Sequence, residues 1–156
     1  MAKKKPQATK RISNRRARHD YELADGILVG IALTGAETKS LRRGHGQLRG
    51  AYVTVKDGEL WLINASITSS PGIEISESEQ TRSRKLLAKR REINEFIASK
   101  QQGRTLVPLE ILTHGRYVKV RIAAGKGKKL YDKRQSLKKR DEQRSMQSAV
   151  KNSLQR

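Results

Sequence analysis

The three histidines are the side chains best suited to acid–base or metal chemistry, and their placement in the sequence favours neither. His19, His45 and His114 are widely separated, and no two have the spacing of a metal site. The chain has no cysteine, which excludes thiolate zinc sites and disulfides. It also lacks the G-x-S-x-G motif of a serine nucleophile. We therefore expect a protein that is not an enzyme and that needs no metal and no cofactor.

Two glycine-containing segments invite comparison with nucleotide-binding loops. Residues 35–40 end in Lys-Ser, but the glycine that should directly precede the lysine of a phosphate-binding loop is absent. Residues 44–50 do not match the dinucleotide fingerprint either. We interpret the glycines of both segments as residues that turn the chain.

Three basic segments have a composition that suits RNA. Residues 14–21 combine arginine, imidazole, amide and phenol groups, which can grip phosphates and stack on unpaired bases. Residues 81–87 lead into an expected helix, whose first N–H groups suit phosphate. Residues 125–134 form a glycine-jointed basic run with one aromatic side chain, Tyr131. For each segment alone, a solvated charged surface remains the alternative.

The overall charge supports a polyanionic partner. Lys and Arg total 35, Asp and Glu total 15, and the formal net charge is +20. Such a chain is expected to act against nucleic acid. No apolar stretch approaches the roughly 20 residues of a membrane span, and no apolar region follows the basic start as in a signal peptide. We therefore expect no membrane association and a cytoplasmic location.

The charge is unevenly distributed, and this predicts the domain organisation. Residues 1–19 carry eight basic and no acidic groups, residues 20–115 carry thirteen and twelve, and residues 116–156 carry fourteen and three. We interpret residues 1–18 as a disordered basic arm, 19–124 as the folded core and 125–156 as a basic tail. That both ends merely improve solubility remains an alternative.

Periodicity and turn residues predict a mainly β core with a few helices. Asp57-Gly58 between two β-rich runs predicts a hairpin. Residues 105–112 and 117–123 predict a second hairpin, in which Pro108 indicates an edge position or a bulge. Residues 21–33 predict one or two further strands, 37–43 and 85–101 predict helices, and 67–80 predict a loop. This pattern favours a small, OB-like antiparallel β-barrel.

Five segments, in this order, closely resemble the SsrA-binding protein (small protein B) family. They are residues 14–21, 35–42, 81–87, 105–109 and 127–134, and the resemblance extends over roughly residues 12–145. The family resemblance implies an OB-like barrel that binds RNA. It also implies a C-terminal tail that is unstructured in the free protein and helical when bound to the ribosome.

The resemblance further implies binding to the tRNA-like domain of transfer-messenger RNA and a requirement for its stable association with stalled ribosomes in trans-translation. The protein would mimic the anticodon arm of a tRNA, with the tail in the empty decoding site of the small subunit and the messenger channel. Indirect partners would be alanyl-tRNA synthetase and the tRNA-delivering elongation factor, and we expect a monomer. A structural ribosomal protein and an RNA-processing enzyme are the competing hypotheses.

By matching motif, Asn14 and Leu87 fall where the family contacts its RNA. Leu28 departs from the family pattern, because an acidic residue is usual at this position. The full set of expected RNA-binding residues is Asn14, Arg15, Arg16, Arg18, His19, Lys39, Arg82, Arg84, Lys85 and Leu87. The expected ribosome-binding residues of the tail are Lys126, Lys128, Lys129, Tyr131, Asp132, Lys133, Arg134, Lys138 and Arg140.

Overall fold

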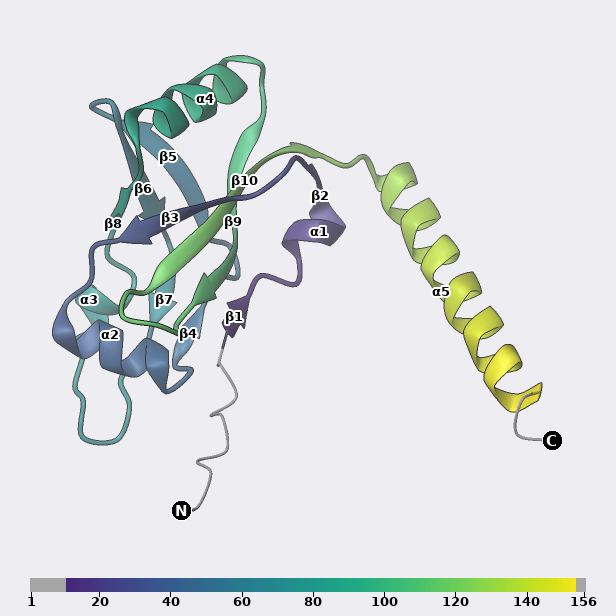
Figure 1. Ribbon diagram of the computed structural model, residues 1–156, viewed down its shortest axis with the longest axis horizontal. Coiled ribbons are helices and arrows are strands. Elements are labelled where there is room, and N and C mark those ends of the chain that lie inside the picture. The colour runs from purple at the N-terminus through teal and green to yellow at the C-terminus, as the bar shows by residue number, and fades with distance from the viewer. Residues whose placement is uncertain (1–10, 154–156) are drawn as a thin grey trace.

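Residues 11–153 are described by the computed structural model, so residues 1–10 of the expected arm and residues 154–156 lie outside it. Figure 1 shows a β-barrel with helices at its periphery and one long helix projecting from it. The elements, in chain order, are β1 (Arg11–Ser13), α1 (Ala17–Asp20), β2 (Tyr21–Leu23), β3 (Ile27–Ile31), α2 (Gly35–Arg42), β4 (Gly46–Gln47), β5 (Tyr52–Lys56), β6 (Glu59–Ile63), β7 (Ser66–Ile67), α3 (Glu77–Gln80), β8 (Arg84–Leu87), α4 (Arg90–Gln101), β9 (Thr105–Leu112), β10 (Lys119–Gly127) and α5 (Leu130–Ser153).

Six strands close the barrel in the order β9-β5-β6-β8-β3-β10, and β10 pairs back with β9. The two longest strands make closure possible, because each serves two partners in succession along one edge. β9 pairs with β5 and with β1, while β10 pairs with β3 and with β2. Closure satisfies the backbone groups that an open sheet would expose at its edges. The prediction of a mainly β protein with an OB-like antiparallel barrel is confirmed.

Local turn chemistry explains both hairpins. Asp57 and Gly58 have φ values of 53° and 71°, the left-handed conformation that a two-residue hairpin turn requires at both positions. In the second hairpin, Glu110 pairs with Arg121, but the next pair is Pro108 with Ile122, so one residue of β9 bulges out. Proline has no N–H to give to the ladder, and a bulge accommodates it. Both predicted hairpins, and the predicted irregularity at Pro108, are confirmed.

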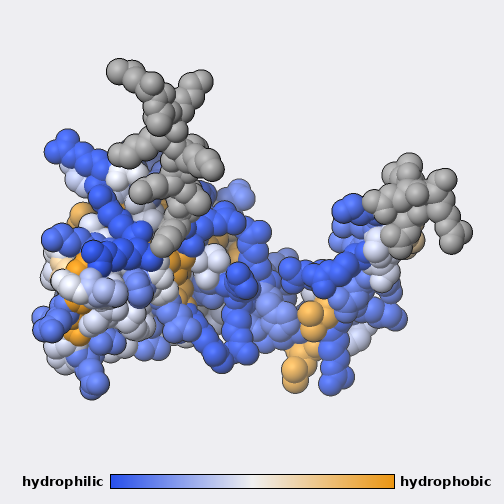
Figure 2. Space-filling view, turned by 90° about the horizontal axis from the view of Figure 1, so that it is seen from below, coloured by the Kyte–Doolittle hydropathy of each residue, from blue (hydrophilic) through white to orange (hydrophobic). Residues whose placement is uncertain are grey.

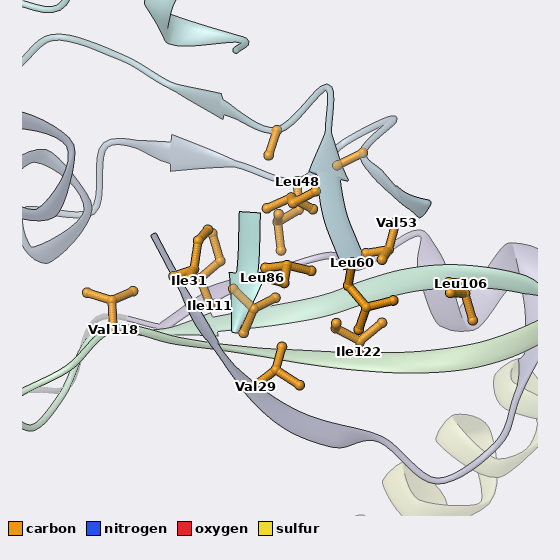
Figure 3. Packing of buried hydrophobic residues seen from close by; sticks show 14 of the residues in the cluster. Val29, Ile31, Leu48, Val53, Leu60, Leu86, Leu106, Ile111, Val118 and Ile122 are labelled. Carbon is orange, nitrogen blue, oxygen red and sulfur yellow. The ribbon is translucent and has the colours of Figure 1, made fainter. Parts of the chain in front are cut away.

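The core is formed by every second residue of the strands. One row across β1, β9, β10 and β3 is Ile12, Ile111, Val120 and Val29, and all four are buried. Figure 3 shows the last three of these positions among the apolar side chains that fill the barrel. Because side chains alternate between the two faces of a strand, the neighbouring rows of the same strands face outward.

The helix expected over residues 85–101 is wrong at its start. Residues 84–87 form strand β8, in which Arg84 and Leu86 are buried while Leu87 is exposed, the alternation of a strand. The helix begins only at Arg90, where the side chain of Glu92 accepts from the backbone N–H of Lys89 at 2.8 Å. Sheet pairing with β3 and β6 overrides the helical spacing of the apolar residues.

The ordered part of the chain is longer than expected at both ends. β1 and α1 lie within the segment predicted as an arm, because Ile12 and Ala17 are buried in the fold. β10 continues to Gly127, past the expected end at residue 124, by pairing with β2. Residues 67–80, expected as a loop, contain the end of β7 and the short helix α3. None of the helices within residues 11–153 combines the length and apolar character needed to cross a membrane.

Candidate nucleic-acid interface

One outer face of the barrel carries several of the predicted RNA-binding positions. The register aligns Arg11, Leu112, Lys119, Gly30 and Leu87 across β1, β9, β10, β3 and β8. Residues directly opposite one another in a sheet share a face, so this row points away from the core. With strands about 4.8 Å apart, the row extends about 19 Å along the barrel surface.

The next outward row is ordered by an acid between two arginines. Glu110 accepts from Arg121 Nε at 3.0 Å and lies 3.6 Å from Nη1 of Arg11. The carboxylate holds both guanidinium groups on the face and leaves a net positive charge there. Leu28 pairs with Arg121 in this row and is 37% exposed.

A groove at the end of this face combines apolar and basic side chains. It has a volume of about 520 Å³, and its lining includes Leu28, Lys85, Leu87 and Lys89. Leu87 is 55% exposed, and Lys85 donates to Glu59 at 2.6 Å. An apolar floor flanked by cations can receive the face of a base and hold its phosphate. The structure thus brings two predicted residues, Lys85 and Leu87, together with Leu28.

A second groove lies beside α1. It has a volume of about 400 Å³, and Asn14, Arg16, Tyr21, Arg49 and Tyr52 contribute to its lining. Arginine and exposed tyrosine side chains are suited to phosphate contact and base stacking. Sequence analysis missed Arg49 and Tyr52. The signal was present for Tyr52, because it alternates with Val53 and Val55 and therefore had to face outward.

Asn14 has a structural contact as well as a place in the second groove. Its backbone N–H donates to the carbonyl of Leu109 at 2.7 Å, and its side-chain Nδ2 donates to the carbonyl of Pro108 at 3.0 Å. These bonds attach the turn before α1 to the bulge of β9. Buried Ala17 then anchors α1, which leaves Arg15, Arg16 and Arg18 exposed around it. The predicted residues of segment 14–19 therefore do form one basic surface.

The prediction that Arg84 contacts RNA is wrong. Its side chain is 0% exposed, and its guanidinium donates to Glu37 and to several backbone carbonyls. Arg82 is partly exposed but also donates to Glu37, at 2.8 and 2.6 Å. The arginines of segment 81–87 face a carboxylate brought from α2, a long-range contact that the local sequence did not reveal. Lys39 is exposed on α2 and lines neither groove.

The electrostatics of Glu37 explain how an acid is kept inside the protein. Burial alone would raise the pKa of this carboxyl, but hydrogen bonds from Arg82 and the backbone of Thr34, and the charge of Arg84, lower it below its usual value of 4.5. Glu37 therefore remains ionised and paired. Because both oxygens are occupied by donors, the carboxylate serves the fold and is not placed to act as a catalytic base.

The C-terminal segment forms a surface of its own. α5 is a single helix that extends away from the barrel (Figure 1), and Tyr131 is exposed near its start. Lys128 and Lys133 both reach back to α1, through contacts to the carbonyl of Arg18 and the carboxylate of Asp20 at 3.1 Å each. The other predicted tail residues, all exposed, are Lys126, Lys129, Asp132, Arg134, Lys138 and Arg140.

Fold and surface together define a class. Figure 2 shows a predominantly hydrophilic surface over the barrel and the projecting helix, with only small, separate hydrophobic areas. Within residues 11–153, no three His, Asp or Glu side chains are grouped to hold a metal ion. These are the properties of a nucleic-acid-binding protein built on a small, closed β-barrel. The family model described as SmpB protein matches residues 11–152, so the chain belongs to the SmpB family.

Individual relatives agree with this assignment. The SsrA-binding protein of Nostoc sp. (strain PCC 7120 / SAG 25.82 / UTEX 2576) is 50% identical over 141 residues, which cover 89% of this chain and 91% of the relative. That of Trichodesmium erythraeum (strain IMS101) is 44% identical over 154 residues, or 97% and 99% of the two chains. A solved structure described as "tmRNA-SmpB: a journey to the center of the bacterial ribosome" contains a chain with 40% identity and a TM-score of 0.64, covering 78% of this chain and 86% of that one. The resemblance found in the sequence is confirmed.

Proposed function

We propose that this chain binds the tRNA-like domain of transfer-messenger RNA and stabilises the association of that RNA with stalled ribosomes. The observation that carries the proposal is the outer face of the barrel, where exposed cations and exposed leucines lie together in a chain of this family. Relatives named as SsrA-binding proteins, and a structural neighbour described with tmRNA and the ribosome, support the choice of RNA.

The two grooves suit a folded RNA better than a linear one. The first offers Leu28 and Leu87 between lysines, and the second offers Tyr21 and Tyr52 between arginines. Folded RNA is recognised through phosphates and through bases that are free to stack, and each groove provides both kinds of contact. The predicted residues Arg15, Arg16, Arg18 and His19 would extend the second groove over the RNA backbone.

The tail supplies the ribosomal part of the proposal. α5 has 24 residues, so it extends about 36 Å at 1.5 Å per residue. We propose that it enters the empty decoding site of the small subunit and the messenger channel. There its exposed cations would pair with phosphates, and Tyr131 would stack on a base. Barrel and tail together would mimic the anticodon arm of a tRNA, in a cytoplasmic protein that acts as a monomer.

Other components would act on the RNA while this protein holds it. Alanyl-tRNA synthetase and the tRNA-delivering elongation factor would be indirect partners, reached through the bound RNA. The competing hypothesis of an RNA-processing enzyme pointed to Glu37 as a catalytic carboxylate, but the ion pairs of Glu37 commit it to the fold. The competing hypothesis of a structural ribosomal protein predicts one copy in every ribosome.

Capture of bound RNA tests the proposal directly. The protein is precipitated from growing cells and the RNA bound to it is sequenced, with purified ribosomes assayed for the protein in parallel. We expect strong enrichment of transfer-messenger RNA and far less than one copy per ribosome. Binding of the purified RNA should also weaken steeply with salt, since about six to ten phosphate contacts correspond to roughly 10³-fold or more between 50 and 200 mM. Enrichment of ribosomal RNA alone, with one copy per ribosome, would overturn it.

A further inference from the structure

The tail leaves the barrel at Asp20, which occupies an unusual position in the sequence. It is the first acidic residue of the chain and directly follows the basic segment 15–19. In the structure, Asp20 ends α1 and is followed at once by β2. A carboxylate here opposes RNA phosphates, so its presence in the basic surface calls for a different explanation.

The backbone fixes where the tail emerges. β10 pairs with β2 as far as Gly127 opposite Tyr21, and one step further the N–H of Lys128 donates to the carbonyl of Asp20 at 2.8 Å. Gly125 makes this pairing close, because a Cβ there would lie 2.9 Å from Leu23 Cδ2 and 3.1 Å from Tyr21 Cβ. The end of the ladder therefore brings the first residues of the tail against α1.

Side chains add a second attachment one helical turn later. Lys133, in the first turn of α5, donates from Nζ to Oδ1 of Asp20 at 3.1 Å, and Nδ1 of His19 lies 2.9 Å from the same oxygen. The two side chains of the Lys133–Asp20 pair are 28% and 34% exposed, so water screens the contact only in part. The hydrogen bond with His19, together with that from Lys133, lowers the pKa of Asp20 and keeps it ionised.

This attachment determines the direction of the rest of the helix. From residue 134 to residue 151, every described side chain of α5 is exposed, so those side chains do not pack on the barrel. An α-helix is a stiff rod with a rise of 1.5 Å per residue, and the part beyond Lys133 is therefore about 30 Å long. A small change of angle at Asp20 becomes a displacement of many ångströms at the far end.

We propose that Asp20 is a positioning residue for the C-terminal helix, holding α5 at a fixed angle to the RNA-binding barrel through Lys133. The inference rests on the proposed function, because it gives the barrel and the tail separate partners that must be reached at the same time. Asp20 acts through Lys133 and not through RNA. Its loss should therefore separate the two activities, leaving RNA binding intact and impairing the ribosomal step.

Charge exchange tests this directly. The variants are Asp20→Lys, Lys133→Glu and the double exchange, each in the full-length chain. Since the chain has no cysteine, single cysteines placed at exposed Lys56 and Gln147 can carry spin labels that report the distance between barrel and helix. We expect one narrow distance distribution in the wild-type protein, broad distributions in both single variants and a narrow one again in the double exchange.

Matched controls separate position from charge. Glu74→Lys makes the same charge change as Asp20→Lys at an exposed loop residue, and Lys151→Glu makes that of Lys133→Glu at the far end of the same helix. Both controls should keep the narrow distribution. A narrow distribution in both single variants, or failure of the double exchange to restore it, would overturn the positioning role of Asp20.

Activity provides a second and independent measurement. The single exchanges should keep affinity for transfer-messenger RNA within about tenfold, a change of at most roughly 1.4 kcal/mol, while tagging of proteins made from a messenger without a stop codon falls by more than that factor. The double exchange should recover tagging. Equal loss of RNA affinity and tagging would place Asp20 in the RNA surface and overturn the inference. If wild-type protein itself bound no transfer-messenger RNA, the proposed function would fail, and the distance measurement would still decide the role of Asp20.

Discussion

Arg84 and Glu37 form an ion pair inside the protein, with 2.9 Å between Nε of the arginine and Oε1 of the glutamate. Glu37 also accepts from the backbone N–H of Thr34, which caps α2. Arg84 donates further to the carbonyls of Ala65, Glu79 and Gln80. One buried pair thus connects α2, α3 and the turn between β6 and β7 to strand β8.

Removal of one partner should be costly. Arg84→Met leaves Glu37 buried beside the partly exposed Arg82 alone, and a broken buried pair typically costs about 3–5 kcal/mol. Urea denaturation monitored by circular dichroism measures this loss of unfolding free energy. Arg82→Met is the matched control and should cost much less, because solvent can reach the carboxylate when that outer arginine is gone. Equal losses in the two variants would contradict the structural role given to Arg84.

Stability should fall in acid because of Glu37. Its pKa is lower in the folded protein than the usual 4.5, so the group favours folding above that pH and loses this contribution as the pH falls through the folded-state pKa. Denaturation midpoints from pH 7 down to pH 3 should therefore decline below about pH 4.5. Glu37→Gln should be less stable at pH 7 and should decline less steeply. An identical pH profile in the variant would contradict the assignment.

Two adjacent leucines of β8 should respond oppositely to a charge. Leu87 is 55% exposed and Leu86 is 2% exposed. Leu87→Asp should weaken binding to transfer-messenger RNA by at least about tenfold, roughly 1.4 kcal/mol, with little change in melting temperature. Leu86→Asp should unfold the protein, because it buries an unpaired charge. Thermal denaturation and gel-shift assays distinguish these outcomes, and normal RNA binding by Leu87→Asp would remove the first groove from the interface.

The second groove predicts a role for Tyr52. Tyr52→Ala should reduce RNA affinity by about 1–3 kcal/mol if the ring stacks on a base. Tyr117, exposed in the turn between β9 and β10, is a matched control outside both grooves. Tyr117→Ala should leave affinity nearly unchanged. Similar effects of the two substitutions would indicate general loss of aromatic surface and not a stacking site at Tyr52.

Truncation after Tyr131 should separate barrel from tail. The barrel is closed by residues up to Gly127, so the shortened chain should retain its melting temperature and bind transfer-messenger RNA within about tenfold, or 1.4 kcal/mol. Tagging of proteins from a messenger lacking a stop codon should be abolished, as the helix proposed for the messenger channel is missing. Tyr131→Ala in the full chain should impair tagging more than Tyr131→His, which retains a ring for stacking. Normal tagging by the truncated protein would contradict this division of roles.

The sequence alone determined the features that depend on neighbouring residues. Asp57-Gly58 fixed a hairpin because two residues with positive φ are needed there, and such preferences are set within a few bonds. Alternating apolar residues specified which face of each strand is buried. The excess of positive charge at both ends and the five ordered motifs were sufficient to identify the family.

Only the tertiary structure decided which charged groups are available. Arg84 and Lys85 are adjacent in sequence, yet one is buried against Glu37 and the other faces a groove. The contacts Arg84–Glu37 and Lys133–Asp20 join residues 47 and 113 positions apart. Local preferences carry no information about such pairs, because closure of the barrel and the end of the β2–β10 ladder bring them together. The free energy of a charge depends on the groups that surround it in space, and those are defined only by the complete fold.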